Sequence, residues 1–319
     1  MIVLNEREVR DLLDMESCIE AMEDVLVSLA QGELFQPLRS VARPTDAPGF
    51  IGLMPSHRGG RSPAYALKEI VVTPDNPTRG LDAHQGSVLL HDGQTGELVA
   101  ILNASPVTEI RTAAVSAVAT RALARPGAGR VAILGAGVQA RAHVDAMRAV
   151  LDDPEIRVWA RRLEAAEELA GQVGATVAPS VDAALFGAEV VCTTTSASEP
   201  IVERRWLVTG AHVNAVGAFG PNRELDNETM AGASLFVDRR ESAFNEGGDY
   251  GLAAADGAIG PDDIEAELGE VLAGMHPGRE HEDELTVFKS YGIGVEDLAT
   301  ADLVVRRARE RGLGIEVEF

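Results

Sequence analysis

Residues 135–140, Gly-Ala-Gly-Val-Gln-Ala, constrain the fold of this chain most, because they form a G-x-G-x-x-A pattern. The apolar run 131–134 precedes them, and residues 139–151 have the composition of a helix. In such a turn, Gly135 permits the tight bend and Gly137 lets the backbone approach a pyrophosphate. Free N–H groups at the helix start then favour phosphate. The pattern predicts a dinucleotide-binding turn; the alternative is a structural glycine turn in an unrelated α/β fold.

Short apolar segments alternate with helical stretches from residue 130 onward. Such alternation indicates βαβ units and a parallel sheet. Residues 33–104 instead contain strands and turns without long helices. We predict an α/β protein with a Rossmann-type, doubly wound parallel sheet domain at 119–292. A mixed α+β domain is then built from both chain ends, 1–118 and 293–319. The predicted strands of the parallel sheet lie within 130–137, 156–162, 175–179, 189–195, 212–218 and 234–238.

Capping residues indicate where several helices begin. Ser105 followed by Pro106 is typical of an N-cap and first helical position, so a long alanine-rich helix is predicted to start there. This puts Arg111 in the first turns of that helix. Asp226 is predicted to cap a later helix. Residues 264–274 are also expected to be helical.

The chain is strongly acidic, since 50 Asp plus Glu against 28 Lys plus Arg give a net charge of −22. Such a charge repels phosphate backbones, and no basic run offsets it. No stretch approaches the ~18 consecutive apolar residues of a membrane span. The first residues are acidic and helical, unlike a secretory signal. We therefore expect a cytoplasmic protein that binds neither nucleic acid nor membrane.

Potential metal ligands do not form a recognisable site in the sequence. Cys18 and Cys192 are the only cysteines, which excludes a disulfide scaffold and a cysteine-based zinc site. Both lie among apolar residues and are expected to be inert, buried thiols. The charged run 279–284 is interpreted as a solvated loop, because no zinc-ligand spacing is present. We predict no bound metal.

Lysine is rare, and Lys68 and Lys289 are the only two in the chain. The acidic, lysine-poor composition fits either adaptation to a salty cytoplasm or a coding bias toward Ala, Gly and Arg. In both cases a lysine kept in an apolar stretch needs a reason. Lys68 lies in such a stretch, the candidate strand 65–72. The alternative is a solvent-facing strand position, since Leu67 and Glu69 flank it in alternation.

The residues after the second predicted strand of the parallel sheet indicate which cofactor is preferred. An NAD enzyme usually carries Asp or Glu there to hold the ribose hydroxyls. This chain has Ala160, Arg161 and Arg162, with no carboxylate before Glu164. Two guanidinium groups favour a 2′-phosphate through charge-assisted hydrogen bonds. We predict NADP(H) as the preferred cofactor, with NAD(H) possible; the alternative is that the arginines only cover the surface.

Over nearly its whole length the sequence resembles the ornithine cyclodeaminase/μ-crystallin family. The resemblance implies a homodimer in which the domain built from both chain ends holds the substrate and forms the dimer interface. It also implies a small α-imino, keto or amino acid as substrate. The matching stretches, in order, are QPLR (36–39), LKEIVVTPDNP (67–77), GELVAIL (96–102), TEIRTAAVSA (108–117), GAGVQA (135–140), GAHVNAVGAF (210–219), RELD (223–226) and TVFKSYGIGVEDL (286–298).

Residue-by-residue matching to this family implies roles for individual side chains. Arg39 and Arg111 resemble the clamp for the substrate carboxylate, and Lys68 resembles the active-site lysine beside the reacting carbon. For Arg39 a surface salt bridge is the alternative. Burial and the two arginines should lower the pKa of Lys68, making it a usable proton donor or acceptor near neutral pH. The implied cofactor contacts are Thr112, Gly135, Gly137, Val138, Gln139, Ala160, Arg161 and Arg162, with Thr194, Thr195, Val216 and Ser290 as further candidates near the nicotinamide.

One departure from the cyclodeaminase pattern favours a particular reaction. Cyclodeaminases, and some amino-acid dehydrogenases of the family, carry an aspartate just after the VGA-type turn, where this chain has Phe219. Phenylalanine offers only an apolar wall for a pocket. Like the QPLR stretch and the paired arginines, this resembles the μ-crystallin-like ketimine reductases. We expect NAD(P)H-dependent reduction of the C=N bond of an α-imino acid. The alternatives are a cyclodeaminase, an alanine-dehydrogenase-like enzyme, or an NADPH-dependent binding protein.

Overall fold

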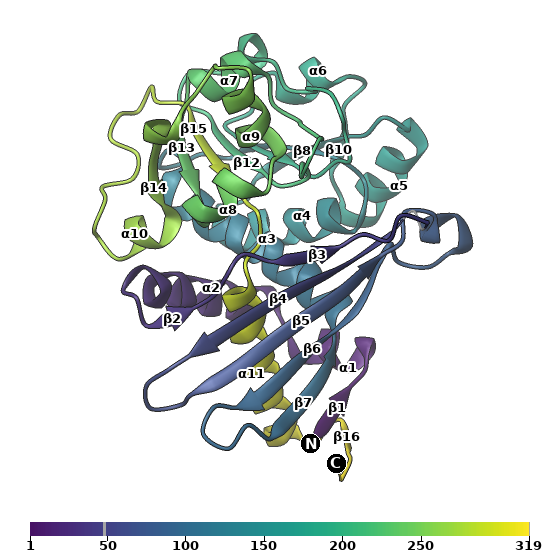
Figure 1. The fold of residues 1–319 in the computed structure, drawn as a ribbon. Coiled ribbons are helices and arrows are strands. Elements are labelled where there is room, and N and C mark those ends of the chain that lie inside the picture. The colour runs from purple at the N-terminus through teal and green to yellow at the C-terminus, as the bar shows by residue number, and fades with distance from the viewer. Residues whose placement is uncertain (47–48, 319) are drawn as a thin grey trace. The chain divides into compact units, whose positions relative to one another are not determined.

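The chain contains two compact units, and the computed structural model describes residues 1–46 and 49–318 (Figure 1). The terminal unit comprises Met1–Arg111 and Gly292–Phe319, and the central unit comprises Thr112–Tyr291. The helix α3 (Ala104–Leu123) begins in the first and ends in the second. The predicted α/β class is confirmed, because the central unit holds a wholly parallel sheet and the terminal unit a mixed one.

The parallel sheet of the central unit is doubly wound. Its strand order is β10-β9-β8-β11-β12-β15-β13-β14, so the chain runs outward from β8 in one direction and then returns to add β11 on the other side. Such a reversal of strand order is where dinucleotides bind in Rossmann folds. The strands are β8 (Arg130–Leu134), β9 (Glu155–Trp159), β10 (Thr176–Val177), β11 (Val190–Thr193), β12 (His212–Ala215), β13 (Ser234–Val237), β14 (Ile264–Glu267) and β15 (Thr286–Lys289).

Helices connect these strands and shield the faces of the sheet (Figure 1). Because both faces are covered, the central strands are buried along their whole length, as in β11, β12 and β15. The helices are α4 (Val138–Val150), α5 (Leu163–Val173), α6 (Val181–Leu185), α7 (Asn227–Ala231), α8 (Arg240–Asn245), α9 (Gly248–Ala255) and α10 (Leu268–Leu272), with short 3-10 turns at Arg204–Trp206 and Pro261–Asp263.

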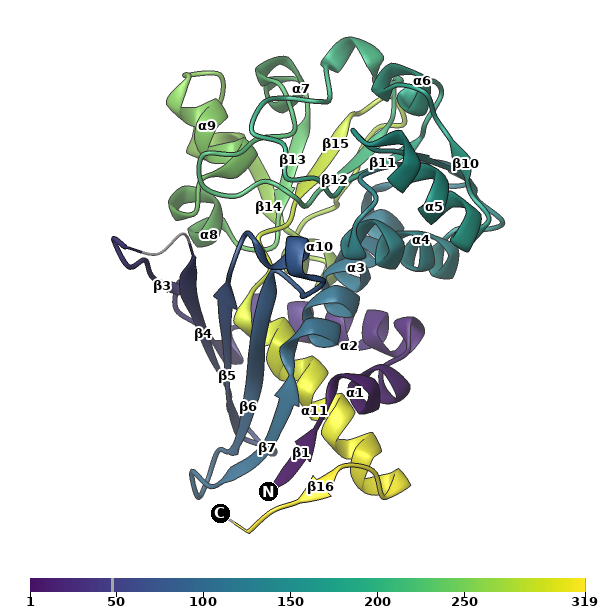
Figure 2. The same ribbon diagram turned by 90° about the vertical axis from the view of Figure 1, so that its right-hand side faces the viewer.

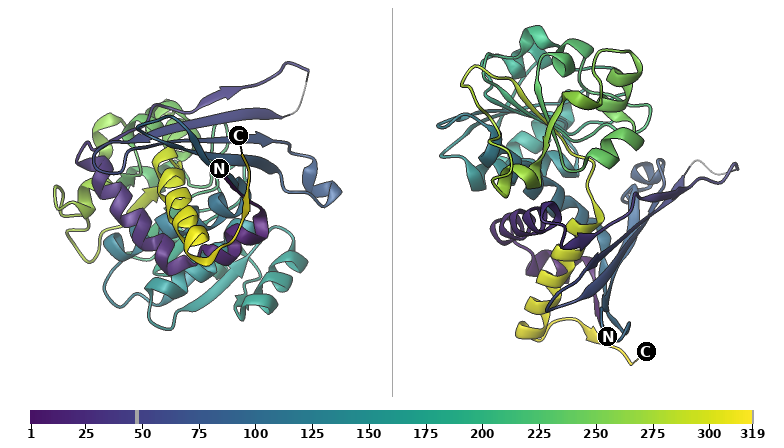
Figure 3. Two further views of the ribbon diagram at one scale, coloured as in Figure 1. Left: turned by 90° about the horizontal axis from the view of Figure 1, so that it is seen from below. Right: turned by 60° about the vertical axis from the view of Figure 1, so that its left-hand side comes forward.

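The terminal unit contains a mixed sheet with helices on one side (Figure 2). Its strand order is β16-β1-β7-β6-β5-β4-β2, and β3 pairs with β4. Seen from below, α2 and α11 lie on the same side of this sheet (Figure 3, left). The elements are β1 (Ile2–Leu4), α1 (Glu6–Leu12), α2 (Met15–Ala30), β2 (Leu34–Phe35), β3 (Ser40–Ala42), β4 (Phe50–Arg58), β5 (Ala64–Val72), a 3-10 turn (Asn76–Arg79), β6 (His84–Asp92), β7 (Leu98–Asn103), α11 (Gly294–Arg311) and β16 (Ile315–Glu316).

Strand register in the terminal unit separates two rows of side chains. The first row runs across β4, β5, β6, β7 and β1 and is buried on the helix side: Met54, Lys68, Val88, Leu102 and Leu4. The next row points to the opposite face and is only partly covered: Pro55, Leu67, Leu89, Ile101 and Val3. The helix side therefore holds one lysine in a row of apolar residues.

Two local predictions are wrong. Helix α3 begins at Ala104, and the Asn103 side chain accepts a hydrogen bond from the Ser105 N–H at 2.9 Å, so Ser105 is not the N-cap. The segment 264–274 is not one helix, because its first four residues form β14 and pair with β13. Burial of Ile264 and Ala266 in the sheet outweighs local helix preference there.

Two further local expectations, the cap at Asp226 and the burial of both cysteines, agree with the structure. The Asp226 side chain accepts a hydrogen bond from the Thr229 N–H at 2.8 Å and caps α7, as predicted. Cys18 and Cys192 are buried, and burial raises the pKa of each thiol to about 12. None of the helices in the described ranges combines the length and apolar composition needed to cross a membrane. The same ranges contain no group of three or more His, Cys, Asp or Glu suited to a metal ion.

Candidate active site

Lys68 lies in the middle of β5 and points to the helix side of the terminal sheet, not to solvent. It is only 1% exposed. Its Nζ donates to Oδ1 of Asp297 at 2.9 Å and lies 2.8 Å from Oδ2. Asp297 belongs to the first turn of α11 and is itself 0% exposed. The lysine therefore forms a buried ion pair, which excludes the solvent-facing alternative.

The surroundings of Lys68 lower its pKa to about 8. Burial is the largest cause, and the positive charges of Arg111 and Arg39 act in the same direction. The charge and hydrogen bond of Asp297 oppose them. An amine with a pKa near 8 exchanges protons readily near neutral pH, which suits acid–base chemistry.

Arg111 shares the carboxylate of Asp297 with Lys68. Its Nε donates to Asp297 Oδ1 at 3.2 Å, and its Nη1 donates to Glu296 Oε2 at 2.8 Å. Both acidic residues are fully buried on α11. Breaking such an arrangement leaves a buried charge without a partner, so these contacts fix the position of the guanidinium group.

Gly292 brings the second arginine into the same cluster. The Nη2 of Arg39 donates to the carbonyl oxygen of Gly292 at 2.7 Å. Gly292 has φ +69, and a Cβ built on it would lie 2.4 Å from Arg111 Nη1. Only glycine fits this backbone conformation and this close approach. Arg39, Arg111 and Lys68, which the sequence suggested separately, are therefore gathered in the terminal unit.

Glu296 and Asp297 are functional candidates that sequence reasoning missed. The available signal was an acidic pair in a long segment, residues 286–305, that is otherwise largely apolar. The cluster holds three cationic side chains, Lys68, Arg39 and Arg111, against these two carboxylates. With Lys68 protonated, cationic groups outnumber carboxylates among these five side chains, which favours an anionic ligand such as a carboxylate.

In the central unit, the predicted glycine turn follows β8 directly. Gly135 has φ +133, and a Cβ on it would lie 2.5 Å from Thr194 Oγ1 and 2.9 Å from the Thr194 carbonyl oxygen. The turn is thus pressed against the end of β11, where strand order reverses. Gly137 is the N-cap of α4 and provides no side-chain cap for the first-turn N–H groups, among them those of Val138 and Gln139. This arrangement fits a pyrophosphate.

The end of β9 lies beside the same turn. The Gly135 N–H donates to the carbonyl oxygen of Trp159 at 2.7 Å, and Ala160 follows directly. Arg161 and Arg162 are both exposed, and Arg162 is the N-cap residue of α5. Both guanidinium groups thus extend from the strand end where a cofactor ribose is expected.

The remaining predicted cofactor residues of the central unit lie at strand ends, except Thr112, which is a buried residue of α3. Val216 follows β12, and its N–H donates to the Thr193 carbonyl oxygen at 3.0 Å. Ser290 follows β15, and its N–H donates to the Ala215 carbonyl oxygen at 3.0 Å. Thr195 donates from its hydroxyl to Glu224 at 2.6 Å. These strand ends form one edge of the sheet, together with Thr194.

Phe219 lies in the loop after β12 and is 38% exposed. Its ring meets that of Tyr291 edge to face, with centroids 6.3 Å apart. The ammonium of Lys289 lies 5.1 Å from its centroid on a buried side. The Phe219 ring is therefore in contact with two buried residues, Tyr291 and Lys289, while part of the ring remains exposed to solvent.

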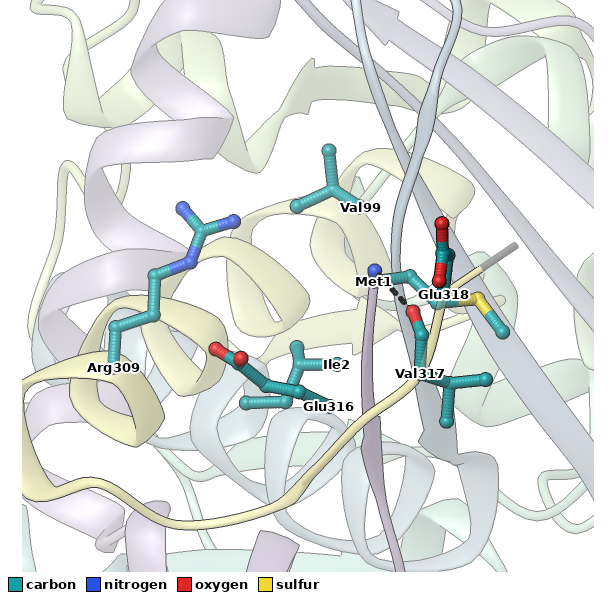
Figure 4. Close-up of a pocket in the computed structure, with 7 residues that line it drawn as sticks. All are labelled: Met1, Ile2, Val99, Arg309, Glu316, Val317 and Glu318. Atoms are coloured by element: carbon teal, nitrogen blue, oxygen red, sulfur yellow. Dashed lines mark hydrogen bonds between the residues drawn. The ribbon is translucent and has the colours of Figure 1, made fainter.

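A pocket between the two chain ends contains none of these candidates (Figure 4). There, the terminal ammonium of Met1 donates to the Val317 carbonyl oxygen at 2.9 Å. Arg309, Glu316 and Glu318 complete its polar lining. Its position is separate from the Lys68 cluster in the sequence and in the sheet, so we do not assign the substrate site to it.

The glycine turn at the sheet switch point and the buried lysine–arginine cluster together define an oxidoreductase of the dinucleotide-binding class. The chain belongs to the ornithine cyclodeaminase/mu-crystallin family, whose model matches residues 1–312. This confirms the resemblance seen in the sequence.

Individual relatives are similar over nearly their full length. Ketimine reductase mu-crystallin of Mus musculus is 41% identical over 308 residues, covering 94% of this chain and 95% of the relative. The structure of Thermococcus litoralis Delta(1)-pyrroline-2-carboxylate reductase in complex with NADH and L-proline has a TM-score of 0.94 and 35% identity, covering 99% of this chain and 100% of that one. An archaeal alanine dehydrogenase dimer with bound NAD has a TM-score of 0.94 and 30% identity, covering 100% and 99%.

Proposed function

We propose that this protein uses NAD(P)H to reduce the C=N bond of an α-imino acid to an α-amino acid. The substrate is a cyclic ketimine or the imine of a keto acid with an amine. The observation that carries the proposal is the buried Lys68, whose pKa is lowered to about 8 and whose partner Asp297 also binds Arg111. The activities named for the mouse and Thermococcus relatives support it.

The side chains of the terminal unit are assigned to substrate binding and proton transfer. Arg39 and Arg111 bind the substrate carboxylate through charge-assisted hydrogen bonds. Lys68 keeps the imine nitrogen protonated, so that its carbon stays electrophilic, and returns to its protonated form from solvent. Asp297 holds the ammonium in one position throughout. The nicotinamide cofactor, when bound at the glycine turn, supplies the hydride.

We assign cofactor binding to the central unit, at Thr112, Gly135, Gly137, Val138, Gln139, Ala160, Arg161, Arg162, Thr194, Thr195, Val216 and Ser290. The lack of room for a Cβ at Gly135 and the uncapped start of α4 support this assignment. Arg161 and Arg162 favour the 2′-phosphate of NADP(H), while NAD(H) binds more weakly. The cofactors named for two of the similar structures are NADH and NAD. The proposed preference for NADP(H) therefore rests on the two arginines of this chain and not on these relatives.

Phe219 is assigned to an apolar contact with the substrate. A phenyl ring neither accepts a proton nor polarises water. Reduction of an imine that Lys68 keeps protonated needs no acid–base group at this position, whereas deamination of ornithine does. The residue therefore supports a reductase over a cyclodeaminase.

We further propose that the functional form is a homodimer joined through the outer face of the terminal sheet. The row of Pro55, Leu67, Leu89, Ile101 and Val3 lies on this face and is only partly covered within the chain. Tyr65 and Val71 on β5 add exposed apolar surface, at 50% and 44% exposed. A contiguous apolar face of this kind is typical of a subunit interface. The archaeal relative is named as a dimer.

A screen of NADPH oxidation tests the reaction. Pyrroline-2-carboxylate and piperideine-2-carboxylate are compared with pyruvate, glyoxylate and oxaloacetate, each with ammonia or methylamine, and the amino acid product is identified by mass spectrometry. We expect turnover with at least one imine and little proline or ammonia from ornithine and NAD. Brisk ornithine deamination, or cofactor binding without turnover of any imine, would overturn the proposal.

A further inference from the structure

We propose that Lys289 is a positioning residue that holds the loop after β12, residues 216–222, in the shape that the reaction needs. It is the second of only two lysines in the chain. The inference rests on the proposed function, since this loop carries Phe219 and Val216. Lys289 itself is 1% exposed and is not proposed to touch substrate or cofactor.

The ammonium of Lys289 is bound to both ends of the first loop turn. It donates to the carbonyl oxygen of Ala218 at 2.8 Å and to that of Ala215 at 3.3 Å. Its third direction faces Asp249, whose Oδ2 lies 3.4 Å away. Two of the three ammonium donors therefore have carbonyl acceptors, and the positive charge lies beside the Asp249 carboxylate. The two carbonyl groups would lose this buried partner if the ammonium were removed.

The same ammonium supports the aromatic side chain of the loop. It lies 5.1 Å from the Phe219 ring centroid and 5.2 Å from that of Tyr291. A cation at this distance from a ring face attracts it, and the attraction is strongest where water is excluded. Lys289 therefore restricts the orientation of the Phe219 ring, part of which is exposed to solvent.

Two buried carboxylates, those of Asp249 and Glu224, connect Lys289 to the backbone of neighbouring segments. Asp249 Oδ1 accepts hydrogen bonds from the Glu224 and Leu225 N–H groups at 2.6 and 2.9 Å. Glu224 in turn accepts from the N–H groups of Thr195 and Gly217, at 2.7 and 2.8 Å. The loop is thus fixed near its start by Lys289 and at Gly217 by Glu224, while Asp249 fixes the residues just after its end, Glu224 and Leu225.

Close packing leaves the loop backbone little freedom around this network. A Cβ on Gly217 would lie 2.1 Å from the Thr195 carbonyl oxygen. A Cβ on Gly248 would lie 2.6 Å from the Ala218 carbonyl oxygen, the same atom that Lys289 binds. A buried ammonium is expensive in free energy compared with an apolar side chain of the same length. Its presence is explained by the carbonyl groups and ring that it orients.

The test compares Lys289→Met with the matched control Arg125→Met. The control removes the ion pair with Glu189, which precedes β11 at the opposite edge of the same sheet. We expect Lys289→Met to reduce kcat for imine reduction about 100-fold, as for a misplaced reacting group. NADPH affinity should fall much less than kcat, because the glycine turn, Arg161 and Arg162 are untouched. Hydrogen exchange of residues 216–222 should become faster, while the control alters neither kcat nor this exchange.

A second variant covers the case in which Lys289→Met does not fold. The double variant Lys289→Met with Asp249→Asn removes both charges, so that Asp249 is not left as an ion beside a missing ammonium, and it should show the same loss of kcat. Normal kcat and normal loop exchange in a folded variant would overturn the proposal. Failure of both variants to fold would also overturn it, because Lys289 would then serve stability alone. If the wild-type protein reduces no imine, the proposed function fails, while loop exchange and NADPH binding still test the role of Lys289.

Discussion

Lys68 and Asp297 form an ion pair that is buried inside the terminal unit, with Nζ 2.8 Å from Oδ2 and side chains that are 1% and 0% exposed. The pair joins the middle of β5 to the first turn of α11. Since burial lowers the pKa of the lysine and the aspartate raises it, the balance between the two sets the pH range of proton transfer.

Replacing Lys68 should abolish most turnover without abolishing cofactor binding. Lys68→Ala is expected to lower kcat for imine reduction by about 10²–10⁴-fold, the usual value of a positioned proton donor. NADPH affinity, measured by fluorescence titration, should stay close to that of the wild type. Glu69→Gln is the matched control, because it changes a charge on the same strand but on the other face. Normal turnover by Lys68→Ala would remove the lysine from the reaction.

The pH profile should respond to Asp297. Reduction uses the protonated lysine, so kcat/KM is expected to fall as the pH rises through about 8. In Asp297→Asn the charge that raises the Lys68 pKa is gone, and this fall should move to lower pH. Comparing both proteins with one substrate cancels the ionisation of the substrate itself. A profile that stays in place, or moves to higher pH, would contradict the assignment.

The sequence predicted those parts of the molecule that depend on neighbouring residues. The glycine turn at 135–140 is one example, because strand, turn and helix follow one another within twenty or so residues. The prediction for residues 264–274 failed, because pairing of β14 with β13 depends on residues about thirty positions away. Likewise Asn103 caps α3 in place of Ser105 because of where β7 ends.

The contacts made by the acidic residues of the candidate site could not be predicted from neighbouring residues. Asp297 is 229 positions from Lys68 and meets it only because α11 packs on β5 in one particular register. Gly292 gave no signal as a site residue, although it separates Arg39 from Arg111. Long-range packing therefore decides which charges surround the lysine, whereas the lysine itself was marked by its rarity.

The two arginines should differ in their effect on stability. Arg39→Met is expected to raise KM for the imino acid about 10- to 100-fold, because it removes a charge-assisted contact with the carboxylate. Arg111→Met should do the same and also lower the free energy of unfolding by about 3–5 kcal/mol, since Glu296 and Asp297 lose a buried partner. Steady-state kinetics and urea unfolding separate the two effects. An unchanged KM in both variants would exclude the clamp.

Cofactor preference should depend on the residues after β9. In the double variant Arg161→Ala with Arg162→Ala, the dissociation constant for NADPH should rise about 10- to 100-fold, while that for NADH changes little. The contrast arises because only NADPH carries the 2′-phosphate. Arg7→Ala, on the surface of α1, serves as a control for lost positive charge. Equal losses for both cofactors would show that the arginines do not select the phosphate.

The outer face of the terminal sheet should determine the oligomeric state. Leu67→Asp puts a charge in the centre of the row formed with Pro55 and Leu89, and a desolvated, unpaired carboxylate strongly disfavours association. Light scattering during size-exclusion chromatography should show a dimer for the wild type and a monomer for this variant. Phe186→Asp, at a 79% exposed apolar residue of the central unit, should remain a dimer. A monomeric wild type, or a Leu67→Asp variant that stays dimeric, would exclude this face as the interface.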